Sequence, residues 1–142
     1  MHWSLILMRW AAVAMVLAGL SSCGRKASRP TTPAAPKSVR KGWTQEGIAS
    51  WYGVPYHGRK TASGEVYDMY QLTAAHKTLP FGVVVEVHNK TNARKVEVRV
   101  TDRGPFVKGR IIDLSRAAAE AIALIGPGTA PVKIKVVRTK AP

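Results

Sequence analysis

The sequence predicts a small, mainly β domain whose six strands close into a barrel. Six short runs of β-type residues, bounded by turn residues, lie between residues 48 and 137 of this 142-residue chain. One alanine-rich run among them suits a short helix. Six strands in about 90 residues favour a barrel over a sandwich, because closure removes edge strands that so short a chain could not protect.

The individual elements follow from local patterns. In KVEVRVTD, at 95–102, valines alternate with polar residues, which is typical of a strand with one buried face. Further on, Ser115 can cap a helix, RAAAEAIAL supplies helix-forming residues, and Gly126-Pro127 ends it. The predicted strands are 48–52, 71–75, 82–88, 95–102, 110–114 and 131–137.

The N-terminus predicts a lipoprotein signal peptide over residues 1–22. Arg9 precedes an apolar run from Trp10 to Leu20, which is shorter than the roughly 20 apolar residues that span a bilayer. Leu-Ser-Ser-Cys then resembles the site at which bacterial lipoproteins are cut and acylated, so we expect lipidation at Cys23, the single cysteine. An ordinary signal peptide with an incidental thiol, or an uncleaved anchor, are the alternatives.

The rest of the chain divides into a linker, a barrel and a tail. Acyl chains on Cys23 would tether the protein to a membrane. Gly24 stands where Asp commonly signals inner-membrane retention, so we expect the outer membrane, facing the periplasm. Residues 23–46 are rich in Pro, Ala and basic residues and predict a disordered linker. The barrel is predicted over 47–137, and 138–142 form a tail.

The positive charge points to a polyanionic partner outside the cytoplasm. The chain carries a formal net charge of +14, and residues 47–142 alone hold 15 Lys and Arg against 7 Asp and Glu. The predicted secretory signal and the lack of interleaved aromatic residues after Tyr70 argue against a nucleic-acid partner. The expected partner is the anionic cell wall, and the protein is expected to be a monomer. We expect no metal and no cofactor, because His57, His76 and His88 lie far apart in the sequence.

Five motifs occur in an order and spacing that resemble the rare lipoprotein A (RlpA) family. The motifs are ASWYG at 49–53, TASGE at 61–65, TAAH at 73–76, DRGPF at 102–106 and IDLS at 112–115. The resemblance implies a double-psi β-barrel, the fold of expansins. It also implies a lytic transglycosylase, which cuts peptidoglycan between N-acetylmuramic acid and N-acetylglucosamine, favours peptide-stripped strands and leaves 1,6-anhydro ends. Some family members carry a C-terminal SPOR domain, which the tail does not match.

Asp102 is the first candidate catalytic residue. Alternation places it on the same strand face as Val96, Val98 and Val100, so we expect a half-desolvated carboxyl group with a raised pKa at the barrel mouth. The alternative is an Asp that stabilises the turn at 103–105. The resemblance favours catalysis, in which one carboxyl group protonates the glycosidic oxygen and then takes the proton of the sugar's 6-hydroxyl.

Two further catalytic candidates come from the motifs. Glu65 matches the acidic position of the family's Ser-Gly-Glu motif, although it could be an exposed loop acid, with Asp68 acting in its place. His76 ends an apolar-leaning run, where it can donate to a carboxylate or to a sugar hydroxyl. A histidine that is simply buried in the core is the alternative.

Other residues are assigned to binding and support. Tyr52, Asp68 and Arg103 are the candidate substrate-binding residues, since a flat aromatic face beside carboxylates suits a sugar groove. Trp51 is assigned to the core. Asp113 is interpreted as a buried support for nearby arginines or for the following helix.

Two classes of function remain at this point. The first is a lytic transglycosylase that acts on peptidoglycan glycan strands. The second is a non-catalytic, expansin-like module that binds or loosens the wall. The presence of Glu65, His76 and Asp102 together in the matching motifs favours the enzyme. A hydrolase that uses water is a third, less favoured possibility, and it would need the same acids.

Overall fold

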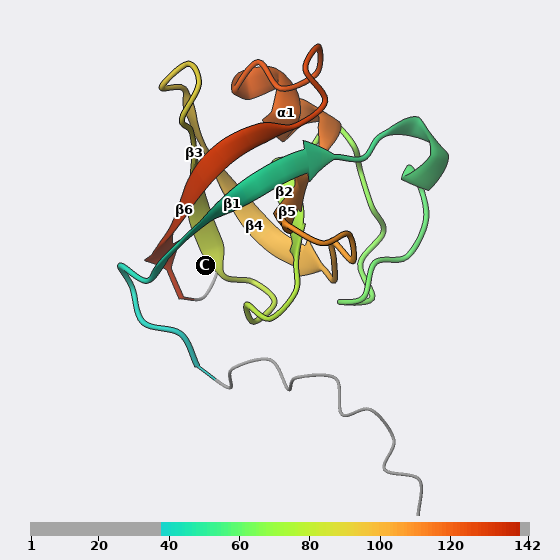
Figure 1. Cartoon of the computed structure of the whole chain (residues 1–142). Helices are drawn as coiled ribbons and strands as arrows, with labels where there is room; N and C mark the ends of the chain where they lie inside the picture. The colour runs from blue at the N-terminus through green and yellow to red at the C-terminus, as the bar shows by residue number, and fades with distance from the viewer. Residues whose placement is uncertain (1–37, 140–142) are drawn as a thin grey trace, which may run out of the picture. The chain divides into compact units, whose positions relative to one another are not determined.

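The computed structural model describes residues 38–139, which form six strands and two short helices (Figure 1). Cys23, the predicted signal peptide and most of the predicted linker lie outside the described residues. The elements are β1 Thr44–Trp51, the 3-10 helix η1 Val54–Tyr56, β2 Thr73–His76, β3 Val84–Asn89, β4 Lys95–Asp102, β5 Arg110–Leu114, α1 Arg116–Ala121 and β6 Ala130–Arg138.

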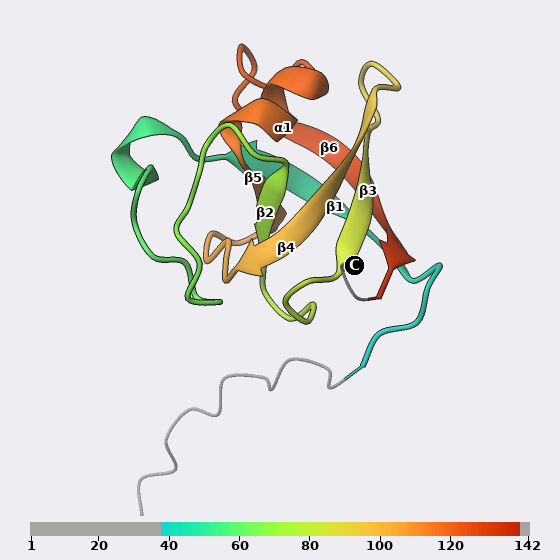
Figure 2. The ribbon, with the colours of Figure 1, turned by 180° about the vertical axis from the view of Figure 1, so that it is seen from behind.

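The six strands form a closed barrel, which confirms the predicted fold class. Their order around the barrel is β1-β5-β2-β4-β3-β6, and β6 pairs with β1 to close it. Two pairs, β1 with β5 and β2 with β4, are parallel, and the other four are antiparallel. The views from the front and from behind show the strands wrapping around one interior, with α1 covering one end (Figures 1 and 2).

Alternating aliphatic residues fill the barrel. In β6, Val132, Ile134 and Val136 are fully buried, while the lysines between them are exposed. Val85 and Val87 of β3 and the three valines of β4 belong to the same cluster of buried side chains. Each fully buried aliphatic side chain contributes roughly 1.5–3 kcal/mol, so these alternating runs supply most of the driving force for closure.

The first strand is longer than its sequence pattern indicated. It begins at Thr44, within the segment assigned to the linker, because Thr44–Glu46 pair along the backbone with Lys133–Lys135 of β6. The sequence pattern did not predict this part of the strand, because its side chains are polar and show no apolar alternation. Backbone pairing does not depend on the side chains. Gly47 is needed there: a Cβ atom at this position would lie 2.5 Å from Ile111 Cγ2.

The helix begins where the sequence predicted and ends earlier. The Ser115 side chain accepts a hydrogen bond from the Ala118 N–H, which confirms the cap. The helix stops at Ala121, and Ala123 adopts a left-handed φ of 53°. This turn allows both Ile122 and Leu124 to be fully buried. Over residues 38–139, no helix has the length and apolar character needed to cross a membrane.

Candidate active site

Four strands bring two carboxyl groups to the same place. In the strand pairing, Asp102 of β4 lies opposite Ala75 of β2, Ala75 lies opposite Asp113 of β5, and Asp113 lies opposite Ser50 of β1. Neighbouring strands are about 4.8 Å apart, so only one small residue separates the two acids. The methyl group of Ala75 leaves open space between them.

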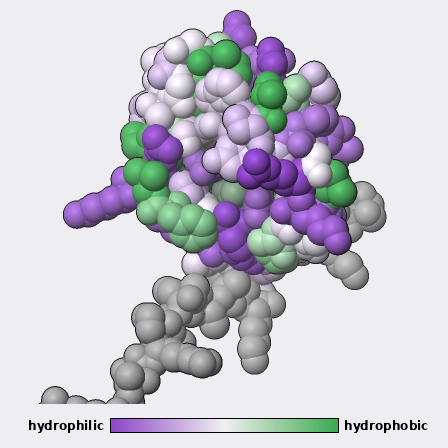
Figure 3. All heavy atoms as spheres, turned by 90° about the vertical axis from the view of Figure 1, so that its right-hand side faces the viewer, coloured by the Kyte–Doolittle hydropathy of each residue, from purple (hydrophilic) through white to green (hydrophobic). Residues whose placement is uncertain are grey.

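Three residues of this row, Asp102, Ala75 and Asp113, line a pocket of about 270 Å³. Its volume is near the lower end of the range for small-ligand sites. The face that carries the long loop between β1 and β2 has hydrophobic side chains in separate patches among hydrophilic ones, an amphiphilic surface of the kind that suits a sugar (Figure 3). Besides Ala75, Asp102 and Asp113, the pocket is lined by Tyr52, Tyr56, Arg59, Lys60, Thr61, Tyr67, Arg103, Gly104, Pro105 and Phe106.

A break in the strand register turns Asp102 away from the valines. Val100 pairs with Ala74, but Asp102 pairs with Ala75, so the alternation is interrupted and Thr101 is also buried. Val100 therefore belongs to the core and Asp102 to the pocket. The predicted face shared by Asp102 and the three valines is wrong, because a bulge resets the period.

Asp102 is held by backbone donors from two motifs. Its Oδ1 accepts hydrogen bonds from the Ala62 N–H at 2.9 Å and from the Arg103 N–H at 2.8 Å. Its Oδ2 makes no hydrogen bond within residues 38–139 and is available to a ligand. The following turn requires Gly104, whose φ is 132°, and the Gly104-Pro105 peptide bond is cis. The turn-stabilising role and a role in the pocket therefore coexist in one carboxyl group.

Asp113 also lines the pocket, on the other side of Ala75 from Asp102. Ser50 Oγ donates a hydrogen bond to its Oδ1, while its Oδ2 lies near the Gly104 backbone in the pocket wall. Burial raises the pKa of Asp113, although the Ser50 hydrogen bond and the charges of Arg110 and Lys77 act in the opposite direction. The sequence reasoning missed its place beside Asp102. The signal available was its position in IDLS, a motif that the strand pairing brings next to TAAH.

His76 lies outside the pocket and has a structural environment. It is 2% exposed, and its Nδ1 accepts hydrogen bonds from the Thr78 and Leu79 N–H groups. The other nitrogen, Nε2, then carries the proton and donates to Gln45 Oε1 at 3.0 Å. Burial, followed by the charges of Arg103 and Lys77, lowers the pKa of His76 to about 4. This neutral ring matches the buried-core alternative.

We expect His76→Ala to lower the free energy of unfolding by about 2–4 kcal/mol. The substitution leaves a cavity, and it leaves the buried Leu79 N–H and the partly buried Thr78 N–H without their acceptor. Urea denaturation of the full chain measures the change. Unchanged stability together with lost glycan cleavage would instead support the catalytic role predicted from the sequence.

Glu65 also lies outside the pocket, in an ion pair. Its two carboxylate oxygens accept hydrogen bonds from Arg99 at 2.7 and 2.9 Å. This pairing lowers the pKa of Glu65, chiefly through the hydrogen bond from Arg99. The same loop supplies Ala62 to Asp102, and its Ser63 N–H donates to the Thr101 carbonyl. The ion pair with Arg99 therefore allows Glu65 to fix the loop that positions Asp102.

A pair of variants separates this positioning role from direct catalysis. If the ion pair is what matters, Glu65→Gln and Arg99→Gln should lower the rate of cleavage to the same extent, and the double variant should be no worse than either. Exposed pairs contribute about 0.2–1 kcal/mol, so we expect a loss of less than tenfold. A large loss in Glu65→Gln with a normal rate in Arg99→Gln would restore the catalytic assignment.

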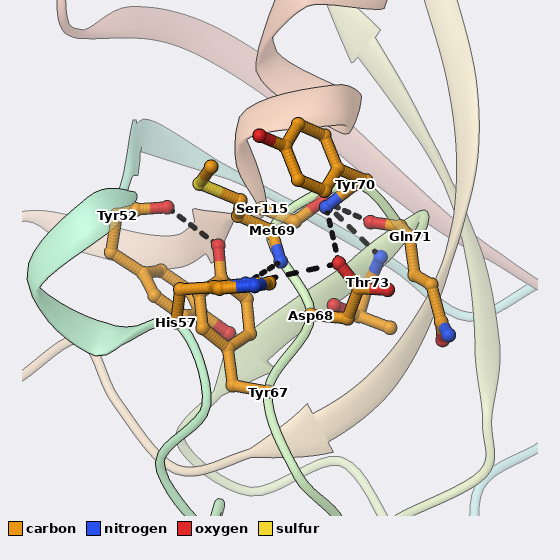
Figure 4. Close-up of polar contacts among 9 residues, drawn as sticks. All are labelled: Tyr52, His57, Tyr67, Asp68, Met69, Tyr70, Gln71, Thr73 and Ser115. Carbon is orange, nitrogen blue, oxygen red and sulfur yellow. Dashed lines mark hydrogen bonds and ion pairs between the residues drawn. The ribbon is translucent and has the colours of Figure 1, made fainter.

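Asp68 stabilises its own turn. Its Oδ1 accepts from the Tyr70 N–H at 2.9 Å and lies 3.8 Å from His57 Nδ1 (Figure 4). His57 Nδ1 in turn accepts from the Met69 N–H. Asp68 does not line the pocket, so substrate contact by Asp68 stays a prediction without geometric support.

Tyr52, by contrast, lines the pocket. Its ring packs 4.5 Å from that of Tyr67, whose hydroxyl donates to the Tyr52 carbonyl at 2.7 Å (Figure 4). The Tyr52 hydroxyl is buried without a hydrogen-bond partner among the described residues. Its pKa is raised by burial and then by the nearby charges of Tyr67, Asp102 and Asp113. The Tyr52 side chain lines the same pocket as both carboxyl groups, while Trp51 packs against the core.

Cations and exposed aromatic rings complete the pocket. Arg103 stacks 3.7 Å from the ring centroid of Phe81 and donates to the His76 carbonyl at 3.2 Å. Tyr56 is 50% exposed and Phe106 is 86% exposed, and both line the pocket. The sequence analysis missed them as site residues. Tyr56 follows ASWYG by three positions, and Phe106 ends DRGPF, so motif proximity was the usable signal.

The described residues contain no cluster of three His, Cys, Asp or Glu side chains placed to hold a metal ion. The pocket itself offers two carboxyl groups, tyrosine side chains and several cations.

A family model described as "Lytic transglycolase" matches residues 44–134, which include every strand of the barrel except the end of β6. The chain belongs to this family. Two similar members are the "Endolytic peptidoglycan transglycosylase RlpA" proteins of Campylobacter jejuni and Vibrio cholerae, 56% and 55% identical over 102 residues. The alignments cover 72% of this chain but only 37% and 39% of those relatives, so the chain matches about two fifths of their length.

Solved structures place the lytic transglycolase barrel in a wider fold group. The Streptomyces papain inhibitor is 27% identical, with a TM-score of 0.59, over 70% of this chain and 99% of its own. An expansin of Clavibacter michiganensis is 20% identical, with a TM-score of 0.56, over 70% of this chain and 53% of its own. An inhibitor and an expansin share the barrel with this family, so the function must be argued from the pocket.

Proposed function

We propose that this protein is a peptidoglycan lytic transglycosylase that cleaves the β-1,4 bond between N-acetylmuramic acid and N-acetylglucosamine and leaves a 1,6-anhydro end. The observation that carries the proposal is the pair Asp102 and Asp113, which flank Ala75 on the floor of one pocket. Glycosidic bond cleavage through an oxocarbenium-like state commonly uses two carboxyl groups. Membership of the lytic transglycolase family supports the reaction class.

The two carboxyl groups suit different roles. A proton donor must hold its proton before the reaction, and burial favours the protonated form of Asp113. Asp113 would protonate the glycosidic oxygen and, once ionised, take the proton of the sugar's 6-hydroxyl as that oxygen closes the anhydro ring. The leaving and entering oxygens bond to the same face of the anomeric carbon, so one carboxyl group can serve both steps. The proton returns to Asp113 and no water is consumed.

Asp102 would face the positive charge that develops on the sugar. Its Oδ1 is fixed by two backbone donors, and its Oδ2 is available. A fixed carboxylate stabilises a developing cation without reorganising during the reaction. The aromatic rings of Tyr52, Tyr56 and Phe106 would hold the sugar against these groups. This division of roles differs from the assignment by sequence alone, which gave both proton transfers to Asp102.

Product analysis tests the proposed reaction. The full chain is incubated with purified glycan strands, and the fragments are identified by mass spectrometry. A 1,6-anhydro end is expected, and its mass is one water lower than that of a reducing end. A reducing end would indicate a hydrolase. Binding without any product would indicate a glycan-binding module.

We also propose that Cys23 carries a lipid that tethers the barrel to the outer membrane, facing the periplasm. The sequence Leu-Ser-Ser-Cys-Gly supports this location, and the segment up to residue 43 supplies the reach. Cys23→Ala is expected to keep the barrel folded and to move the protein from the membrane fraction to the soluble fraction. If the variant still sediments with membranes in high salt, the lipid anchor is wrong.

A further inference from the structure

A second pocket adjoins the first one. It has a volume of about 480 Å³ and shares Tyr52, Tyr56 and Asp113 with the first pocket. Two cations, Arg110 and Arg116, line it and do not line the first pocket. The two pockets therefore form neighbouring halves of one groove, with the Asp113 carboxyl group at their boundary.

The two cations differ in how they are paired. The Arg116 guanidinium donates to Glu120 Oε1 at 2.8 Å. The Arg110 guanidinium makes no hydrogen bond or ion pair within residues 38–139, although its charge lowers the pKa of Asp113. Asp113, the acid that lines the same pocket, accepts its hydrogen bond from Ser50. Of the two cations in the second pocket, the half-buried Arg110 is therefore the one whose guanidinium can pair with a ligand.

We infer that the second pocket holds the substituent of the muramic acid unit whose ring lies in the first pocket, and that Arg110 binds a carboxylate carried on this substituent. This inference rests on the proposed function. Of the two sugars in a peptidoglycan strand, only the muramic acid unit carries a lactyl group, which ends in a carboxylate or continues into a peptide with carboxylates of its own. A guanidinium pairs with carboxylates in a fixed geometry, which makes Arg110 a specificity-determining residue.

The position of Arg110 suits specific binding of the muramic acid unit and differs from that of cations that attract the whole anionic strand. Arg110 and Asp113 line the same pocket, so a substituent held by Arg110 lies close to the proposed proton donor. Other cations, Arg59 and Lys60, line the first pocket and are exposed. They attract any anionic strand through charge that salt screens, whereas a half-buried guanidinium is screened less. Arg110 can therefore distinguish one sugar of the repeat from the other.

The test compares Arg110→Gln with wild type in the full chain. The first two probes are peptide-stripped glycan strands with free lactyl carboxylates, and the same strands after carbodiimide amidation has made those carboxylates neutral. The third probe is strands that still carry their peptides. We expect the variant to bind the free-carboxylate strands about tenfold more weakly and the amidated strands as wild type does. Arg94→Gln is the matched control, because Arg94 is exposed, lines neither pocket and carries the same charge.

The arms of the test separate the outcomes. Strands that still carry peptides show which carboxylate is bound: a tenfold loss for these strands alone assigns Arg110 to the peptide, and a loss for stripped strands assigns it to the lactyl group. Equal losses for Arg94→Gln and Arg110→Gln, or a loss that persists after amidation, overturn the inference while cleavage remains. A wild-type chain that neither binds nor cleaves any strand overturns the proposed function and the inference with it.

Discussion

Asp113→Asn is expected to lower the rate of glycan cleavage by about 10²- to 10⁴-fold, the range in which loss of a general acid falls. Asn can still accept the Ser50 hydrogen bond but cannot transfer a proton, so substrate binding should change little. Single-turnover cleavage of purified strands measures the rate. A substrate with an aryl leaving group needs little protonation, so the variant should lose far less activity on such a substrate.

The raised pKa of Asp113 also predicts how stability depends on pH. The folded state holds this proton to a higher pH than the unfolded chain, whose Asp pKa is near 3.8. Wild-type stability should therefore fall as pH rises from that value through the folded pKa, and Asp113→Asn should lack this component of the decrease. Parallel stability curves for the two proteins across this window would contradict the raised pKa.

Asp102→Asn is expected to lower cleavage by about 10²- to 10³-fold, as removal of a preorganised electrostatic group does. Asn keeps an oxygen that can accept from the Ala62 and Arg103 N–H groups, so the fold should persist. The loss should be equally large with an aryl leaving group, because the missing charge is needed whatever departs. Glu97→Gln, an exposed acid on the same strand that lines neither pocket, is the control for charge.

The aryl substrate distinguishes the two aspartates. Rescue of Asp102→Asn and not of Asp113→Asn would return the proton transfers to Asp102, as the sequence alone predicted. Normal cleavage by both folded variants would remove the pair from the mechanism. Loss of folding in Asp102→Asn would instead support the alternative in which Asp102 mainly holds the turn.

The strands could be predicted because their patterns are strong. The run 95–102 appears in the structure with unchanged bounds, and so does 110–114. The early start of β1 could not be predicted, because Thr44–Glu46 join the barrel through backbone pairing alone. The end of α1 was also missed, since burial of Ile122 and Leu124 outweighs the helix-forming tendency of the alanines around them.

The pocket was only partly predictable, because motif order does not report register. The motifs indicated Asp102 and Tyr52, and both residues line the pocket. They could not show the bulge that turns Asp102 away from Val100, or that Ala75 lies between two aspartates. Glu65 and His76 stand in equally specific motifs, yet the structure gives each a fixed partner outside the pocket. A motif therefore identifies residues that matter without separating contact from support.

The pairing of the first strand with the last one has a consequence for the order of events during biogenesis. β1 has only two partners, β5 and β6, and both are made after β2, β3 and β4. A growing chain therefore carries an unpaired β1 until β5 has been synthesised, and the barrel cannot close until β6 has followed. A chain that stopped before Ala130 would expose the edges of both β1 and β3, where other chains can add. The proposed export to the periplasm would suit this connectivity if the chain crosses unfolded and folds only after its last strand has crossed.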